Sequence, residues 1–103
     1  MRKYEIKFLP RFGKSLKMVY DYIFFELQNP MSADKIEAGI KRKCLTLALF
    51  PKVSPVKKKV GGKSLRFVHY QNYTIVYHVD DEKKNVIIYD VIYSRRDIEK
   101  MLK

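Results

Sequence analysis

The chain has 103 residues, 47% of them hydrophobic, with 4 glycines and 4 prolines, which excludes disordered and fibrous chains and fits one domain, residues 1–103. Its 22 lysines and arginines outnumber the 11 acidic residues and give a formal net charge of +11. A charge of this size on a small chain indicates an anionic partner: a nucleic acid, a membrane surface or an acidic protein.

The N-terminal segment is predicted to form a strand followed by a helix. Residues 4–8 alternate between apolar and polar side chains, the pattern of a half-buried strand, and Pro10 ends that strand. Apolar positions then recur every three or four residues from Phe12 to Leu27, as they do on one face of a helix. We expect this helix to stop before Pro30, because proline disfavours helical backbone at the preceding residue.

A second helix is predicted directly after the first one. Ser32 is suited to cap its first turn, and Pro51 ends it. The residues spaced for one buried face are Ala33, Ile36, Ile40, Cys44, Leu47 and Phe50. Because residues 29–31 form only a short link, we expect the two helices to pair as an antiparallel hairpin.

In the C-terminal half of the chain the hydrophobic period is two residues, as in β-strands. Residues 65–70, 73–79 and 85–93 are rich in β-branched and aromatic side chains, and residues 71–72 and 80–84 suit the turns between them. The last of these strands is apolar on both faces, which predicts a central place in the sheet. These elements predict an α+β fold in which the helix hairpin packs on an antiparallel four-stranded sheet, with the first strand beside a C-terminal one.

The sequence also predicts three details of this half. Leu65, Phe67 and His69 share one face of their strand, and the apolar pair is expected to point toward the helices. Asp90 interrupts an apolar strand, which predicts a salt link to an arginine. Residues 95–102 are predicted to form a short C-terminal helix.

Basic residues are concentrated in one block of the chain. No acidic residue occurs between Glu37 and Asp80, whereas nine lysines and arginines do. The densest part, residues 57–63, is expected to form a mobile loop that contacts phosphates, with a merely solvated loop as the alternative. The predicted target or nucleic-acid contacts are Lys57, Lys58, Lys59, Lys63, Arg66, Arg95 and Arg96.

The sequence contains no segment suited to a membrane and no cluster suited to a metal. No apolar run reaches the roughly 18 residues that a membrane-spanning helix needs, and residues 1–6 do not begin a signal peptide. The single cysteine cannot form an internal disulfide and does not combine with the two histidines into a metal-ligand spacing. We therefore expect a cytoplasmic protein with no cofactor, no metal and no membrane partner.

Three local motifs follow one another along the chain. They are Asn29-Pro30 and Phe50-Pro51 around the second predicted helix, Tyr-Thr-Ile-Val-Tyr at residues 73–77, and Val-Ile-Tyr-Ser-Arg-Arg-Asp at residues 91–97. Together with the order of the predicted elements, they resemble the RelE/ParE superfamily of bacterial toxins. The resemblance implies the toxin of a type II toxin-antitoxin system, held silent by a cognate antitoxin.

Members of this superfamily act in two ways. Those similar to RelE cleave mRNA on the ribosome, and those similar to ParE inhibit DNA gyrase. The mRNA-cleaving members carry an arginine where this chain has Thr74, and they tend to end with an aromatic residue where this chain has residues 101–103, Met-Leu-Lys. Both departures favour the ParE-like side, as does the Arg-Arg-Asp ending at residues 95–97.

An RNA-cleaving member would need a base, an acid and phosphate-binding cations. The candidate catalytic residues are Arg66, His69, Tyr93, Arg95 and Arg96. The three arginines are expected to converge on one anion, with a salt link within residues 95–99 as the alternative. The imidazole of His69 titrates in the range of a general base, and a surface hairpin histidine without a function is the alternative.

Two classes of function follow from these observations. The leading interpretation is a toxin that binds a macromolecular target, DNA gyrase, and is neutralised by an acidic antitoxin that complements the +11 charge. The alternative is an enzyme, a metal-independent mRNA endonuclease that acts on the ribosome. A weaker alternative is a basic nucleic-acid-binding domain.

Overall fold

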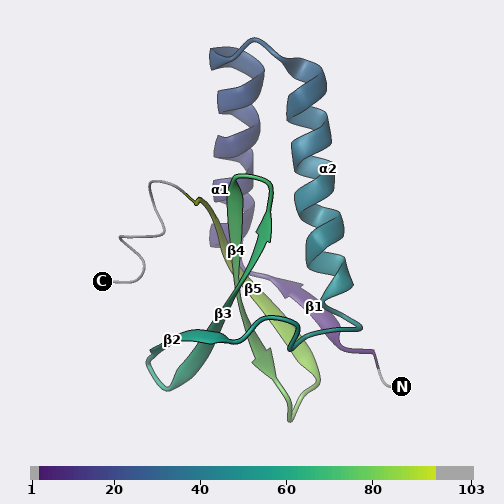
Figure 1. Cartoon of the computed structure of the whole chain (residues 1–103), viewed down its shortest axis with the longest axis vertical. Helices are drawn as coiled ribbons and strands as arrows, with labels where there is room; N and C mark the ends of the chain where they lie inside the picture. The colour runs from purple at the N-terminus through teal and green to yellow at the C-terminus, as the bar shows by residue number, and fades with distance from the viewer. Residues whose placement is uncertain (1–2, 95–103) are drawn as a thin grey trace.

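The structure, a computed structural model, describes residues 3–94 and consists of a five-stranded sheet with a helix hairpin on one face (Figure 1). The strand order is β1-β5-β4-β3-β2. In Figure 1 the two helices stand side by side and extend beyond the strands at one end of the molecule. The elements are β1 (Glu5–Phe8), α1 (Pro10–Asp21), the π-helical turn η1 (Tyr22–Glu26), α2 (Pro30–Thr46), β2 (Val56–Val60), β3 (Lys63–Tyr70), β4 (Tyr73–Asp80) and β5 (Asn85–Tyr93).

The predicted α+β fold is confirmed, and the sheet differs from the prediction in two respects. The sequence predicts a loop over residues 57–63, but β2 forms there and pairs with β3, so the sheet has five strands instead of four. β1 lies beside β5 as expected, but it is parallel to it, because the intervening helices and strands form a crossover long enough for parallel pairing. The C-terminal helix predicted for residues 95–102 lies outside the described residues.

Both helices begin at a proline, which suits a first helical turn because it has no N–H to leave unpaired. α1 starts at Pro10 and passes into η1. The N-cap of α2 is Asn29, whose side-chain oxygen accepts the Ser32 N–H at 3.2 Å. Ser32 is therefore not the cap that the sequence predicts. α2 ends at Thr46, so Phe50 lies beyond the helix and is exposed.

The sheet has a helix face, which the two helices cover, and an open face, which they do not. The core on the helix face consists of Phe12, Leu16, Ile40, Cys44, Leu47, Val68, Ile75, Tyr77, Val86, Ile88 and Val91. A smaller cluster on the open face consists of Leu65, Phe67 and Val76, with Tyr89 and Ile92 packed against it. The prediction that Leu65 and Phe67 point toward the helices is wrong, because both faces of β3 are apolar and alternation alone does not tell them apart.

β5 lies between β1 and β4, as its two-sided apolar pattern predicts. Its Asp90 is buried, next to an irregularity in the pairing with β4. The Arg11 Nε atom lies 3.0 Å from Asp90 Oδ2, and the Val91 N–H donates to Asp90 Oδ1 at 2.8 Å. The predicted salt link to an arginine is confirmed, and it ties the start of α1 to the sheet.

We expect Arg11→Ala to lower the free energy of unfolding by about 1–3 kcal/mol, because a buried carboxylate loses its cation. Lys17→Ala is the matched control. Lys17 pairs with Asp21 at 2.8 Å, but that carboxylate side chain is 41% exposed, against 7% for Asp90. Its loss is expected to cost at most about 0.5 kcal/mol. Urea unfolding measures both changes, and equal values would contradict the role of Arg11.

Gly39 of α2 lies where the helix meets the end of β3. A Cβ at this position would overlap the hydroxyl end of the Tyr70 ring. We expect Gly39→Ala to displace the ring and to destabilise the fold by about 1–3 kcal/mol. Gly13→Ala in α1 is the control, because open space surrounds the added Cβ, and it should stabilise the helix by about 0.5–1 kcal/mol. Thermal unfolding measures the stability of both variants. A higher stability for both would contradict the predicted overlap between residue 39 and the Tyr70 ring.

Candidate functional site

The basic segment forms an edge strand, not the mobile loop that the sequence predicts. Gly61 and Gly62 make the turn between β2 and β3 with φ angles of 57° and 79°. Two consecutive residues with positive φ suit a two-residue hairpin, and glycine adopts this conformation without strain. The glycine pair therefore folds the lysine-rich segment back onto β3 instead of leaving it mobile.

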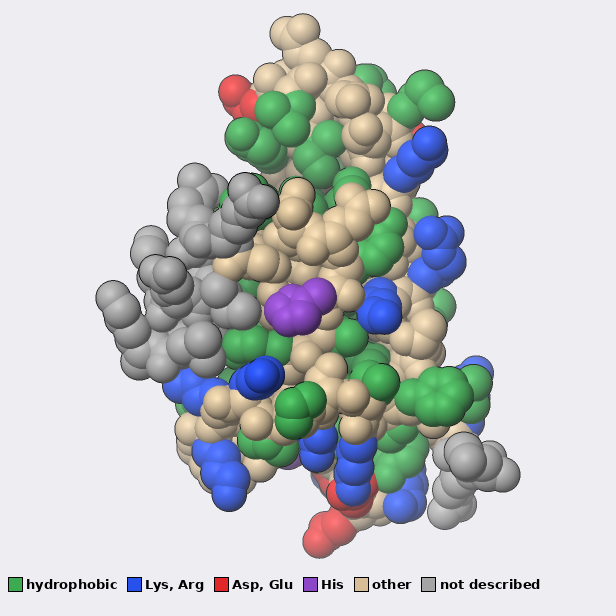
Figure 2. All heavy atoms as spheres, in the orientation of Figure 1, with side chains coloured by type: hydrophobic (Ala, Val, Ile, Leu, Met, Phe, Trp, Pro, Cys, Tyr) green, Lys and Arg blue, Asp and Glu red, His purple; other side chains and the backbone are tan. Residues whose placement is uncertain are grey.

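The lysines of β2 lie along a free edge of the sheet. Lys57 and Lys59 are exposed, and Lys58 is partly buried. Lys63, at the start of β3, is also exposed. Figure 2 shows Lys and Arg side chains in the region of β2 and β3 at the lower left, with others at the bottom of the view and along the right-hand side, where α2 lies. Lysines on an edge strand discourage pairing with another chain, and the exposed Lys57, Lys59 and Lys63 present their charges to solvent, where an anion can bind.

Arg66 is engaged within the fold. It lies on the helix face of β3, opposite Val56 of β2 and Tyr77 of β4. Its Nη1 donates to the Ser54 carbonyl oxygen at 2.6 Å and ties the segment before β2 to the sheet. Burial raises the pKa of Tyr77, and Ser54 and Arg66 oppose this shift. The predicted convergence with residues 95–96 stays a prediction, because these residues lie outside the described part of the chain.

On the open face, an imidazole and two hydroxyl groups form a connected chain. His69 Nδ1 lies 2.9 Å from Thr74 Oγ1, which lies 2.7 Å from Ser94 Oγ. Thr74 is fully buried, whereas His69 is exposed near the β3–β4 turn. His78 instead lies 3.0 Å from the Ser64 carbonyl oxygen, through Nδ1. The sequence analysis missed this chain, which joins residues distant in sequence only after β3, β4 and β5 have paired.

Tyr93 packs at the end of β5. Its ring meets Tyr73 edge-on, with centroids 5.8 Å apart. Burial raises the pKa of Tyr73, and the neighbouring Tyr93 and Tyr22 add to the shift. A raised pKa keeps the Tyr73 phenol protonated at neutral pH. The structure thus gives Tyr93 a packing contact, and residues 95–96 follow it outside the described range.

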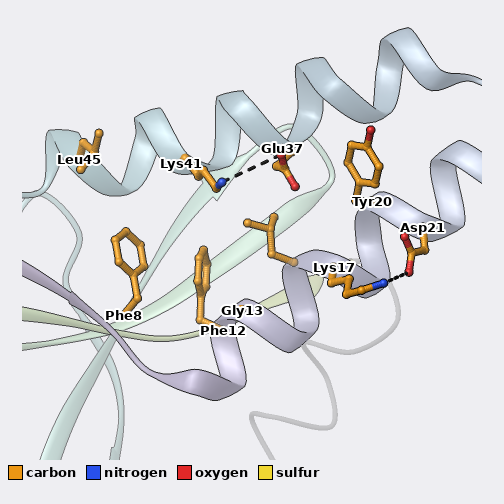
Figure 3. A pocket seen from close by; sticks show the side chains of 10 residues that line it. Phe8, Phe12, Gly13, Lys17, Tyr20, Asp21, Glu37, Lys41 and Leu45 are labelled. Carbon is orange, nitrogen blue, oxygen red and sulfur yellow. Dashed lines mark hydrogen bonds and ion pairs between the residues drawn. The ribbon is translucent and has the colours of Figure 1, made fainter.

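A groove of about 660 Å³ between α1 and α2 is a second feature that the sequence analysis did not find (Figure 3). In Figure 3 the rings of Phe8 and Phe12 point toward α2, which contributes Leu45. Phe8 and Leu45 are 46% and 56% exposed. Gly13 leaves the groove open, because it has no side chain. The remaining lining residues are Leu16, Lys17, Tyr20, Asp21, Glu37 and Lys41.

Polar contacts hold the borders of this groove in place. Lys17 pairs with Asp21 at 2.8 Å, and Lys41 lies 4.0 Å from Glu37. The Tyr20 hydroxyl donates to Asp34 at 2.8 Å, and this hydrogen bond raises the pKa of Tyr20. The two helices are therefore linked across their far end, and the apolar part of the groove stays open toward β1.

Other side chains offer little chemistry. Burial raises the pKa of the Cys44 thiol to about 12, so the thiol stays protonated and is a poor nucleophile. Residues 3–94 contain no group of three or more histidine, cysteine or acidic side chains placed to hold a metal ion. No helix in that range is long and apolar enough to cross a membrane.

Neutralising the β2 lysines is expected to weaken polyanion binding. Each lost phosphate contact lowers the salt slope for a single-stranded oligonucleotide by about 0.7, so glutamine at residues 57–59 should lower it by up to about 2. The matched control, Lys14→Gln/Lys35→Gln/Lys83→Gln, removes the same charge from other exposed positions. Titrations at several salt concentrations measure the slopes, and equal slopes for the two variants would mean that the edge lysines are only solvated.

A family match covers almost the whole described chain. The family described as "ParE toxin of type II toxin-antitoxin system, parDE" matches residues 6–98. The match begins in β1 and continues past the end of β5. No curated protein is similar enough in sequence to match.

Solved structures share the fold. A chain of the ParDE system of Pseudomonas aeruginosa is 17% identical with a TM-score of 0.72, over 88% of this chain and 96% of that one. A chain of the RelBE2 toxin-antitoxin complex of Mycobacterium tuberculosis is 18% identical with a TM-score of 0.67, over 90% of this chain and 93% of that one. A chain of the intact Escherichia coli RelBE complex is 20% identical with a TM-score of 0.63, over 90% of this chain and 99% of that one. Because the identities are this low, the likeness establishes the fold alone.

Proposed function

The chain belongs to the ParE family of toxins of type II toxin-antitoxin systems, and from this premise we propose that it inhibits growth by binding DNA gyrase and not by cleaving mRNA. A cognate acidic antitoxin binds the toxin and neutralises it. Both interactions take place in the cytoplasm and require no cofactor.

The observation that carries this proposal is the lack of arginine on the described part of the open face. An mRNA-cleaving toxin needs cations around the scissile phosphate. Within residues 3–94 the arginines are Arg11, Arg42 and Arg66, which lie on α1, on α2 and on the helix face of β3. Thr74 stands where mRNA-cleaving members of the superfamily carry an arginine, and its hydroxyl is bonded within the sheet. A buried neutral hydroxyl does not replace that cation.

The groove between α1 and α2 supports the antitoxin part of the proposal. Its apolar floor suits the apolar face of an amphipathic helix or the alternate side chains of an extended segment. The net charge of +11 favours an acidic chain and speeds its association at low salt. The structures named above from P. aeruginosa and E. coli are of a ParDE system and a RelBE complex, which also supports an antitoxin partner here.

Primer extension on mRNA from translating ribosomes supplied with the purified protein tests the mechanism. We expect full-length transcripts, because loss of one charge-stabilising group commonly costs about 10²–10³ in rate. A RelE toxin in the same extract is the positive control. Cleavage at codon positions, abolished by Arg66→Ala, would overturn the proposal and favour the ribonuclease.

A further inference from the structure

The end of the helix hairpin where α1 turns into α2 exposes large apolar side chains. In Figure 1 the two helices carry this end beyond the strands, and Figure 2 shows hydrophobic side chains there. Exposed apolar groups gathered in one place mark an interaction site. Five of them are more than half exposed, and we call them the tip: Met18, Tyr22, Phe25, Leu27 and Met31.

The tip differs from the rest of the chain in charge. Residues 18–34 contain none of the 22 lysines and arginines. Their acidic residues are Asp21, Glu26 and Asp34. Glu26 is exposed, and the flanking basic residues are Lys17, which pairs with Asp21, and Lys35. The tip therefore lacks the excess of positive charge that attracts phosphates or an acidic chain elsewhere on this protein.

Contacts within the hairpin fix the tip before any partner binds. The Leu27 N–H donates to the Tyr22 carbonyl oxygen at 3.1 Å and closes the π-helical turn. The Phe25 ring packs against Phe24 with centroids 4.8 Å apart, and Phe24 stacks on Tyr20 at 5.8 Å. An exposed aromatic ring that is already held in place loses little freedom on binding, so Phe25 is suited to anchor an interface.

We propose that the tip contacts the protein surface of DNA gyrase, in an apolar pocket bordered by lysine or arginine, with Phe25 as the anchor. The inference rests on the proposed function, in which gyrase is the target. The groove that we assign to the antitoxin is lined by none of the five tip residues. That groove reaches Tyr20 and Asp21, next to the tip (Figure 3), so an antitoxin bound in it blocks the target by its bulk.

The test is binding of Phe25→Ala to purified gyrase, with inhibition of supercoiling as the second readout. We expect the dissociation constant and the inhibitory concentration to rise at least about 30-fold, as for the loss of an anchor residue. The control is Phe50→Ala, which removes the same ring at 61% exposure, against 64% for Phe25, beyond the other end of α2. It should bind like the wild type. Both variants should melt cooperatively and bind the antitoxin.

A second pair of variants tests the charge beside the tip. Glu26→Lys should weaken gyrase binding about 3-fold or more at low salt, because it faces the basic border of the pocket. Glu82→Lys changes the net charge equally at an exposed position of the β4–β5 turn, and it should not weaken binding. Tighter binding of Glu26→Lys alone would indicate an acidic surface or DNA at the tip and would contradict the inference.

The remaining outcomes separate this inference from the proposed function. If the wild type binds gyrase and Phe25→Ala binds equally well, the tip inference is wrong and the proposed function stands. If Phe25→Ala instead loses antitoxin affinity, or makes a self-associating wild type monomeric in sedimentation, then the antitoxin or a second copy covers the tip and the inference is wrong. If the wild type does not bind gyrase, the proposed function is wrong and the inference fails with it.

Discussion

Ile40→Asp should abolish the cooperative unfolding transition of this protein. Ile40 is fully buried in α2 and belongs to the cluster that joins both helices to the sheet. A carboxylate there has no cation within the core, so burying it costs several kcal/mol against a total stability of about 5–15 kcal/mol. We expect circular dichroism and thermal melting to show loss of the native state, or the protein to become insoluble.

Ala38→Asp is the matched control, because residue 38 lies on the exposed side of the same helix. It places the same side chain two residues away and should leave the melting curve close to that of the wild type, since surface substitutions usually change stability by about 0.5 kcal/mol or less. A wild-type melting curve for Ile40→Asp would mean that the inward face of α2 is assigned incorrectly.

Leu45→Glu should weaken antitoxin binding about 100-fold, which corresponds to about 3 kcal/mol. The side chain lines the groove between α1 and α2 and is 56% exposed, so the free toxin has little to lose from the substitution. In the complex the substitution removes apolar contact worth about 1.5–3 kcal/mol and adds a charge that repels an acidic partner. Calorimetry with the purified antitoxin measures the dissociation constant.

Met31→Glu is the matched control for this substitution. Met31 is an apolar residue of α2 with 72% exposure, and it does not line the groove. It adds the same charge to the same helix, so a general effect of charge on affinity would appear in both variants. Equal dissociation constants for the two variants would place the antitoxin elsewhere on the surface.

The sequence predicts most of the elements because hydrophobic period and proline positions are local signals. The apolar spacing from Phe12 marks the first helix, and the residue clusters at 71–72 and 80–84 mark the turns of the meander. The second helix ends at Thr46, before the stop predicted at Pro51. Asp90 could be assigned a salt link because a buried carboxylate requires a partner. The partner, Arg11, could not be named, since its proximity depends on the pairing of β1 with β5.

The missed features all depend on tertiary structure or on one misinterpreted local signal. The segment from Val56 to Val60 contains three consecutive lysines, so it lacks the apolar alternation by which a strand is predicted. The following Gly61-Gly62 is nevertheless a known hairpin signal. The groove lies between two helices, where Gly13 has no side chain to fill the space, and the hydrophobic period of the sequence gives no sign of such a space. The hydrogen-bond chain through Thr74 needs three strands in register. The candidate site is thus less predictable than the fold.

DNA supercoiling by purified gyrase in the presence of the purified protein tests the central claim most directly. We expect the protein to inhibit supercoiling in a dose-dependent way, the cognate antitoxin to reverse the inhibition, and Arg95→Ala/Arg96→Ala to remove it. Unchanged supercoiling at toxin concentrations that cleave mRNA on ribosomes would contradict the claim and assign the protein to the mRNA-cleaving members of its superfamily.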